Sequence, residues 1–202
     1  MTTEHEKLLN GQDYDYRDPE LQEMLGSARS TVRELNETLD IPTRQKLMKR
    51  LFARVGENTI INGTISVLYG KHMSLGKQVF INDGCRFQDS NLIELGDRVI
   101  VAPDVKFYCG QHDLDATKRY DQRDGQPRLI TTTAPISVGS DTWIGGNVTI
   151  IGGVKIGNNV IIGAGAVVTK DIPDNSIAVG VPAKVVKKLP EIKEQLWKYQ
   201  KH

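Results

Sequence analysis

The chain has 202 residues, of which 25% are charged, and a formal net charge of +1. This balance gives no overall attraction to nucleic acid or to an anionic membrane surface, so we expect neither as a partner. No run of about 18 apolar residues is present, which argues against a membrane-spanning helix. The charged N-terminus and the two cysteines, Cys85 and Cys109, favour a reduced cytoplasmic protein without a disulfide framework.

The first 56 residues carry the spacing of amphipathic helices. Apolar residues between Leu21 and Leu39 recur at helical intervals. A second helix is expected between Pro42 and Gly56, because proline favours the first helical turn and glycine often follows the last one. We therefore expect residues 1–56 to form a helical arm that packs against the rest of the chain.

From about Ile60 onward a period of six replaces the helical period. Aliphatic residues occupy every sixth position in the second half of the chain, at Val138, Ile144, Ile150, Ile156, Ile162 and Val168. A helix repeats at 3.6 residues and a strand at two, so a period of six is typical of a hexapeptide β-helix. An earlier ladder through Leu75, Ile81 and Phe87 slips by two residues before it restarts at Leu95.

The sixfold pattern is lost between residues 108 and 133. This stretch is too polar for a buried turn of the coil, and loops of such length within regular domains are usually functional or mobile. His112 opens the loop, and an imidazole suits the removal of a hydroxyl proton near neutral pH. Of the other histidines, His5 and His202 lie in terminal segments, and His72 is expected at a surface or an interface.

Cys109 lies three residues before His112, which would also be compatible with a thiol nucleophile. Its position in the sixfold pattern favours a small wall residue instead. Residues 57–188 are expected to form the coil domain, and residues 189–202 a short C-terminal helix. A coil with flat apolar faces needs lateral cover, so self-association is expected.

Three C-terminal motifs resemble those of the hexapeptide-repeat acetyltransferases. They are Ile144-Gly145-Gly146-Asn147, the run from Gly163 to Pro173, and Gly180-Val181-Pro182-Ala183-Lys184. The leader, with Leu9, Gly11, Tyr14 and Asp18, is similar to that of the maltose and galactoside O-acetyltransferases. This resemblance implies a mainly β fold, a left-handed parallel β-helix of triangular section that forms a homotrimer with active sites between subunits.

The resemblance also implies a set of site residues. His112 would be the general base of an acetyl-CoA-dependent O-acetyltransferase whose acceptor is a small sugar. Acceptor-binding positions would be Asn82, Asp89, Ser90, Asp15 and Tyr16. Positions along the coenzyme A groove would be Trp143, Gly146, Ala164, Thr169, Lys170, Lys184 and Lys187.

Purely structural roles for several of these residues are also compatible with the sequence. Asn82 could orient a hydroxyl or an oxyanion, or could be a turn residue. Trp143 could line the catalytic cleft or only pack, and the C-terminal lysines could be a solvated basic face. Asp89 is also of a residue type that is common in turns.

Three other functions can be compared with a sugar acetyltransferase on the residues present. A zinc enzyme on the same type of coil needs three imidazoles, whose spacing is absent here, so no metal is expected. An amine or xenobiotic acceptor is possible because Gly110-Gln111-His112-Asp113 lacks the proline that usually follows the catalytic histidine in relatives, and its loss should free the start of the loop. A non-catalytic scaffold would need no coenzyme A groove.

Overall fold

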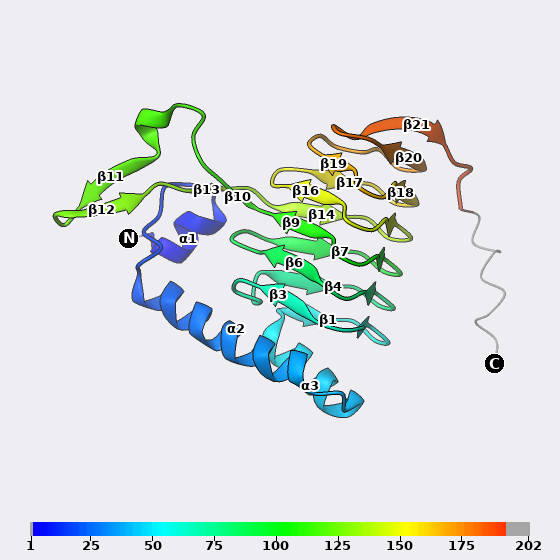
Figure 1. Cartoon of the computed structure of the whole chain (residues 1–202), viewed down its shortest axis with the longest axis horizontal. Coiled ribbons are helices and arrows are strands. Elements are labelled where there is room, and N and C mark those ends of the chain that lie inside the picture. The colour runs from blue at the N-terminus through cyan, green and yellow to red at the C-terminus, as the bar shows by residue number, and fades with distance from the viewer. Residues whose placement is uncertain (1, 193–202) are drawn as a thin grey trace.

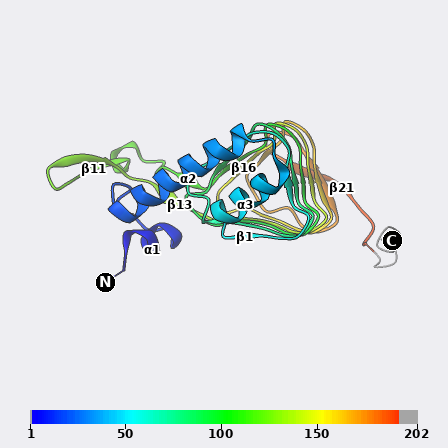
Figure 2. The same cartoon turned by 90° about the horizontal axis from the view of Figure 1, so that it is seen from below.

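The computed structural model describes residues 2–192 as three N-terminal helices followed by a parallel β-helix with three flat faces (Figure 1). The mainly β coil expected from the sixfold period is confirmed. The helices are α1 (Glu4–Leu9), α2 (Pro19–Glu37) and α3 (Ile41–Leu51). Seen from below, the coil has a triangular outline, and α2 and α3 lie across its lower end (Figure 2).

Each face of the coil is a sheet whose strands come from successive turns. Face A consists of β1 (Arg54–Val55), β4 (Met73–Leu75), β7 (Ile93–Leu95), β14 (Ile136–Val138) and β17 (Lys155–Ile156). Face B consists of β2 (Ile60–Ile61), β5 (Phe80–Ile81), β8 (Ile100–Val101), β15 (Trp143–Ile144), β18 (Val160–Ile162), β20 (Ser176–Val179) and the antiparallel β21 (Lys184–Lys188). Face C consists of β3 (Ile65–Val67), β6 (Cys85–Gln88), β9 (Lys106–Tyr108), β16 (Thr149–Ile151) and β19 (Val167–Val168).

The residues of the sixfold ladder line the interior of the coil. On face C, for example, Phe87, Phe107, Ile150 and Val168 are in register from turn to turn and buried. The rings of Phe87 and Phe107 stack with their centroids 4.9 Å apart. The three faces therefore share one continuous apolar core, as a hexapeptide coil requires.

The slip in the early ladder is a longer corner between face C and face A. Six residues separate the inward positions within a turn, but eight separate Phe87 from Leu95. The two additional residues lie in the corner that contains Asp89 and Ser90. We name the three edges the AB, BC and CA corners after the faces that meet there in chain order.

The AB corner repeats the same backbone conformation at every turn. A non-glycine residue with positive φ occupies each of its turns, at Asn58, Gln78, Arg98, Asp141, Asn159 and Asn175. Left-handed conformations are uncommon for non-glycine residues, and asparagine and aspartate tolerate them best. The BC corner has a comparable series at Gly63, Gly84, Asp104, Asn147 and Gly165. The CA corner is irregular, and it carries the long loop.

The helical arm closes the N-terminal end of the coil. Ala28 and Leu35 of α2, with Leu47 and Leu51 of α3, join the apolar core of the coil. Asp40 caps α3, because its side chain accepts the backbone N–H of Thr43 at 2.9 Å. The expected helical cap is thus present, although α3 ends at Leu51.

Three boundaries differ from the sequence expectation. Val55 belongs to strand β1, so Gly56 does not end a helix. Glycine is needed at this position because a Cβ would lie 2.3 Å from the carbonyl oxygen of Gly76. Helix α1 was not expected, although Thr3 and Glu6 form a capping box at its start. Most of the expected C-terminal helix, residues 193–202, lies outside the described residues, and residues 189–192 are not helical. Within residues 2–192, no helix is long and apolar enough to cross a membrane.

Candidate active site

The long loop leaves the coil at the CA corner and is ordered by its own hairpins. Strand β10 (Gly110–Gln111) pairs with β13 (Thr132–Thr133) at the root of the loop. A second hairpin, β11 (Tyr120–Arg123) with β12 (Gln126–Leu129), projects away from the coil beyond the 3₁₀ turn Ala116–Lys118 (Figure 1). The loop is therefore a structured extension of the CA corner.

His112 lies at the root of this loop with an exposed imidazole. Its Nδ1 is 2.8 Å from the carbonyl oxygen of Ile130. A carbonyl oxygen only accepts, so the hydrogen-bond geometry assigns the proton to Nδ1. The lone pair of Nε2 is then available to accept a proton, which is the state a general base needs.

Asp89 and Ser90 lie at the same corner, one turn earlier. The carboxylate of Asp89 is fully buried and accepts the backbone N–H groups of Leu68, Tyr69 and Gly70 at 2.9, 2.9 and 2.6 Å. Burial raises the pKa of Asp89 to about 6, and the three N–H donors oppose this shift. The geometry thus gives Asp89 a role in holding the corner, without an open side from which its carboxylate could meet a ligand.

Ser90 differs from Asp89 because its hydroxyl has no partner. Its side chain is buried at 3% exposure, and its Oγ is the single buried side-chain nitrogen or oxygen among residues 2–192 without a hydrogen bond. A Cβ placed on Gly110 would lie 3.2 Å from this Oγ, so Gly110 passes directly over Ser90. Gly110 precedes His112 by two residues, so Ser90 and His112 belong to the same CA corner.

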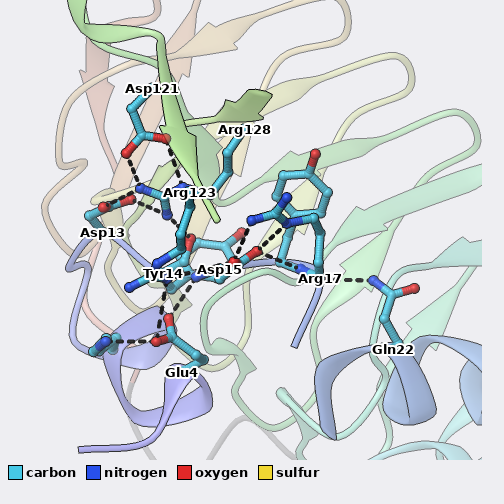
Figure 3. Close-up of polar contacts among 11 residues, drawn as sticks. Glu4, Asp13, Tyr14, Asp15, Arg17, Gln22, Asp121, Arg123 and Arg128 are labelled. Atoms are coloured by element: carbon cyan, nitrogen blue, oxygen red, sulfur yellow. Dashed lines mark hydrogen bonds and ion pairs between the residues drawn. The ribbon is translucent and has the colours of Figure 1, made fainter. Parts of the chain in front are cut away.

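The leader is tied to the loop by a buried arginine that sequence reasoning missed as a contact residue. Arg128 of β12 is 2% exposed and makes paired hydrogen bonds to Asp13 (2.9 and 2.6 Å) and to Asp121 (2.9 and 2.6 Å). Its Nη1 also donates to the carbonyl of Tyr14 at 2.9 Å. The two carboxylates raise the pKa of Arg128 above its already high value. Figure 3 shows this cluster between the leader and the hairpin.

Asp15 and Tyr16, two predicted acceptor-binding residues, lie beside the same cluster. Asp15 forms a paired interaction with Arg17 at 2.9 and 2.8 Å, and Arg123 of the hairpin lies 3.6 Å away (Figure 3). Hydrogen bonds from Arg17 hold the pKa of Asp15 well below its usual range. Tyr16 is more exposed, and its backbone carbonyl accepts a hydrogen bond from Gln22. The structure places both residues at the leader–hairpin contact, and no described interaction joins them to His112.

Asn91 is a second link between leader and loop that sequence reasoning missed. Its buried amide nitrogen donates to the carbonyl of Leu9 at 3.0 Å and to the hydroxyl of Thr133 at 2.9 Å. Its amide oxygen accepts the backbone N–H of Leu92 at 2.7 Å. Neither Asn91 nor Arg128 follows the sixfold period, and their partners lie far away in sequence, so no local pattern could have identified them.

The residues predicted for the coenzyme A groove fall mainly at two other places. Gly146 and Ala164 lie at the BC corner on successive turns, where the N–H of Gly165 donates to the carbonyl of Gly146 at 2.8 Å. Asn82 lies at the same corner, and its amide nitrogen donates to the carbonyl of Val101 at 3.1 Å. Trp143 projects from face B and is 50% exposed.

The three predicted cations and the groove residue Thr169 are exposed near the C-terminal end of the coil. Thr169 and Lys170 follow β19 at the CA corner, where no described side-chain bond engages them. Lys184 and Lys187 lie on β21, the last strand of face B. These ammonium groups can meet phosphates without first breaking an ion pair.

One chain therefore does not bring all the predicted residues together. His112 and Ser90 lie at the CA corner, whereas Asn82, Gly146 and Ala164 lie at the BC corner. Face C separates the two corners, and its three-residue strands alone span about 10 Å. A site that used both groups of residues within one chain would have to span face C.

The remaining candidates from the sequence are structural. Cys85 and Cys109 are buried free thiols, and burial raises the pKa of Cys109 to about 12, which removes the thiolate a nucleophile needs. His72, expected at a surface or interface, is buried, and its Nε2 lies 2.9 Å from Nε2 of His5. His5 is thus engaged in a defined contact. Within residues 2–192, no group of three histidine, cysteine or acidic side chains is arranged to hold a metal ion.

A stacked hexapeptide coil with an exposed histidine in a corner loop and cations near its last turn defines the class of coil-based acyltransferases. Comparison with known proteins specifies the family. The "Bacterial transferase hexapeptide (six repeats)" family matches residues 135–170, and the "Maltose acetyltransferase hexapeptide capping motif" matches residues 7–56. The chain belongs to the hexapeptide-repeat acetyltransferases of the maltose and galactoside O-acetyltransferase type and is an acetyltransferase.

Three relatives illustrate the match. The galactoside O-acetyltransferase of Escherichia coli K12 is 35% identical over 150 residues, which cover 74% of this chain and 70% of that protein. The crystal structure of a maltose O-acetyltransferase from Clostridium difficile 630 has a TM-score of 0.87 at 39% identity and covers 94% of this chain and 98% of that one. A Vibrio cholerae hexapeptide-repeat acetyltransferase in complex with acetyl coenzyme A has a TM-score of 0.85 at 31% identity, covering 94% and 100%.

Proposed function

We propose that this protein transfers the acetyl group of acetyl-CoA to a hydroxyl of a small sugar, with His112 as the general base. The observation that carries the proposal is the hydrogen bond from Nδ1 of His112 to the carbonyl of Ile130, which leaves Nε2 as an exposed acceptor. The names of the relatives support acetyl-CoA as the donor and a sugar as the acceptor.

The reaction needs no covalent enzyme intermediate. Nε2 of His112 takes the proton of the acceptor hydroxyl as its oxygen attacks the thioester carbonyl. The tetrahedral intermediate then expels the coenzyme A thiolate, which takes the proton back from the imidazolium. The amide of Asn82 and backbone N–H groups are the donors proposed for the oxyanion. The buried pKa-shifted Cys109 supports this direct route, since no competing thiolate is present.

The acceptor side is proposed to include Ser90. Its Oγ is buried without a hydrogen-bond partner beneath Gly110, so it would bind a sugar hydroxyl once the chain at Gly110 moves aside on acceptor binding. Asp15 and Tyr16 are proposed as more distant contacts from the leader. Asp89 contributes by fixing the backbone on which Ser90 lies.

The donor side is proposed to follow the BC corner. The absent or small side chains of Gly146 and Ala164 would let the pantetheine arm run close to the backbone. Thr169 would also line the groove, and the ammonium groups of Lys170, Lys184 and Lys187 would bind the phosphates as point charges near the last turns.

A trimer would join the two halves of this site. In a threefold arrangement with the AB corners at the axis, face B of one copy faces face A of the next, and a BC corner meets a CA corner. Face B is suited to this because an apolar ladder crosses it in register, through Ile60, Phe80, Ile100, Trp143, Ile161 and Ile177. Face A carries a groove on the same turn as Trp143, lined by Leu92, Pro135 and Ile136 among others.

The test of the proposed chemistry is His112→Ala. We expect acetyl-CoA binding, measured by calorimetry, to stay within about threefold of wild type, while kcat falls by about 10²–10⁴-fold. Release of the coenzyme A thiol is followed with glucosides, galactosides, maltose and amino sugars as acceptors. Near-normal turnover of the variant would contradict the role of His112, and turnover confined to amine acceptors would replace the sugar with an amine. Failure of the wild-type protein to bind acetyl-CoA would favour a non-catalytic scaffold.

A further inference from the structure

Arg119 holds the backbone that follows His112. It lies at the end of the 3₁₀ turn in the long loop, and its side chain reaches back toward the loop root. Its Nε donates to the carbonyl of Asp113 at 2.8 Å, and its Nη2 donates to the carbonyl of Leu114 at 3.1 Å. These are the first two carbonyls after His112, so one planar guanidinium fixes the direction in which the chain leaves the imidazole.

The backbone of the same arginine holds the other partner of His112. The carbonyl of Arg119 accepts the N–H of Ile130 at 2.8 Å. The carbonyl of Ile130 in turn accepts the Nδ1–H of His112 at 2.8 Å. Arg119 therefore closes a ring of hydrogen bonds that contains His112, Asp113 and Ile130. The ring connects the position of the imidazole to the carbonyl that sets its tautomer.

This ring also accounts for the residue after the histidine. Asp113 was expected to free the start of the loop, because relatives usually have proline there. Instead, its carbonyl is held by Arg119, and its Oδ1 accepts the N–H of Asp115 at 2.8 Å. The loop start is thus fixed by side-chain hydrogen bonds, a different means from a proline ring, and the expectation of a free start was wrong.

We propose that Arg119 is a positioning residue that holds His112 in the orientation and tautomer required for proton transfer. The inference rests on the proposed role of His112 as general base. Arg119 itself touches neither substrate in this account; it acts through the carbonyls of Asp113, Leu114 and Ile130. Misplacement of a reacting group by about 1 Å is enough to cost on the order of 100-fold in rate.

The kinetic test compares Arg119→Ala, Arg119→Lys and His112→Ala in the full-length protein. Arg119→Ala should lower kcat by about 10- to 100-fold, with KM for acetyl-CoA within about twofold of wild type. Lysine should restore only a small part of kcat, because one ammonium does not reproduce the planar fork. The matched control is Lys118→Ala, which removes the neighbouring cation and leaves the ring intact. Lys118 makes a long ion pair with Asp115, at 3.9 Å, and kcat of this variant should stay within twofold of wild type.

Two further measurements separate positioning from a general effect on folding. Arg119 is exposed, so guanidinium at millimolar concentration should recover part of the kcat of Arg119→Ala and none of that of His112→Ala. Nitrogen NMR of the histidines should show the Nδ1–H tautomer for His112 in the wild type and a mixture with Nε2–H in Arg119→Ala. The NMR readout needs no substrate.

The outcomes distinguish the two proposals. An inactive His112→Ala beside an Arg119→Ala with wild-type kcat and an unchanged tautomer would overturn the positioning role alone. A His112→Ala with normal kcat would overturn the proposed function, whatever Arg119→Ala does. Loss of kcat in Arg119→Ala without a tautomer change or guanidinium recovery would also count against positioning.

Discussion

The imidazoles of His5 and His72 are in contact where the leader packs against the coil. Unlike the exposed His112, His72 is buried. Its Nδ1 donates to the carbonyl of Asp89 at 2.7 Å, and its Nε2 faces His5. The ring of Tyr69 packs on one side, and Glu20 lies 3.1 Å from the far nitrogen of His5. Burial lowers the pKa of His72 to about 4, with a smaller contribution from His5. His72 is therefore a neutral structural residue, whereas His112 is open to solvent.

The neutral state of His72 predicts a pH dependence of stability. Between pH of about 6.5 and 4 the unfolded chain protonates this imidazole while the folded chain does not, so the free energy of unfolding falls as the pH is lowered. His72→Gln removes this titration and keeps an amide donor for Asp89. Relative to the variant, the wild type should lose up to about 3 kcal/mol between pH 7 and pH 4.

Urea unfolding of both proteins across this pH range measures the difference. Asp89, whose raised pKa acts with the opposite sign, titrates in both proteins and cancels to first order. A difference in unfolding free energy that stays constant from pH 7 to pH 4 would contradict a buried neutral His72.

Individual residues of the site could be predicted only where they belong to a local sequence motif. The proposal of His112 came from its position at the break in the sixfold period together with the family resemblance. The roles of Arg119 and Arg128 depend on partners that folding brings together; Asp13 and Arg128 are 115 residues apart. Asp89 was predicted as an acceptor-binding residue from the family resemblance. The enclosure of its carboxylate by N–H groups of the preceding turn is a tertiary feature that the sequence does not show.

At the scale of elements, the coil depends on glycines where successive turns come close. A Cβ on Gly139 would lie 2.6 Å from the backbone carbonyl of Gly157 on the next turn. Backbone held in a ladder on both sides cannot move aside for one methyl group without shifting a whole turn. By contrast, a Cβ on Gly26 in α2 would meet no atom within 4 Å.

These two glycines give a matched pair of substitutions. Gly139→Ala should lower the free energy of unfolding by about 2–3 kcal/mol through the backbone clash. Gly26→Ala should raise it by about 0.5–1 kcal/mol, because alanine favours a helix over glycine. Denaturant unfolding measures both, and equal effects of the two changes would argue against the tight contact between turns.

The elements of the coil were more predictable than those of the leader and loop. The sixfold period gave the inward residues, their register and the position of the two-residue slip, because every turn repeats the same packing. The end of α3 was misplaced because Gly56 is a packing glycine of the coil rather than a helix stop. Helix α1 and the hairpin β11–β12 have polar sequences without a clear period. Tertiary contacts hold them in place: Asn91 and Thr133 bind carbonyls of α1, and Arg128 ties the hairpin to Asp13.

At the scale of the whole molecule, faces A and B differ in the character of their outward residues. Face B exposes an apolar ladder in which Ile60, Ile100 and Trp143 are each about half exposed, at 49%, 47% and 50%. The corresponding outward row on face A is polar, through Arg54, Ser74, Glu94, Ser137 and Lys155. An apolar row of this length is typical of a surface that another molecule covers.

This asymmetry predicts which substitution breaks the proposed trimer. Ile100→Glu puts a charge in the centre of the ladder, between Phe80 and Trp143, and should yield monomers in light scattering. Its control, Arg86→Gln on face C, which faces no neighbouring copy in this arrangement, should remain trimeric. Transfer activity should disappear with the trimer, because the proposed site needs corners from two copies. A wild-type monomer with full activity would contradict this arrangement.

The uneven corners of the coil also bear on how such enzymes diversify. At the AB corner every turn must place a residue in the left-handed conformation, so an insertion there would disturb the stack. The CA corner has no such repeated constraint and already accommodates both a two-residue extension and a loop with its own hairpins. Segments of different length and sequence could replace that loop while the turns above and below keep their register. In the proposed arrangement, such a replacement would change the acceptor side and leave the BC corner proposed for the donor intact.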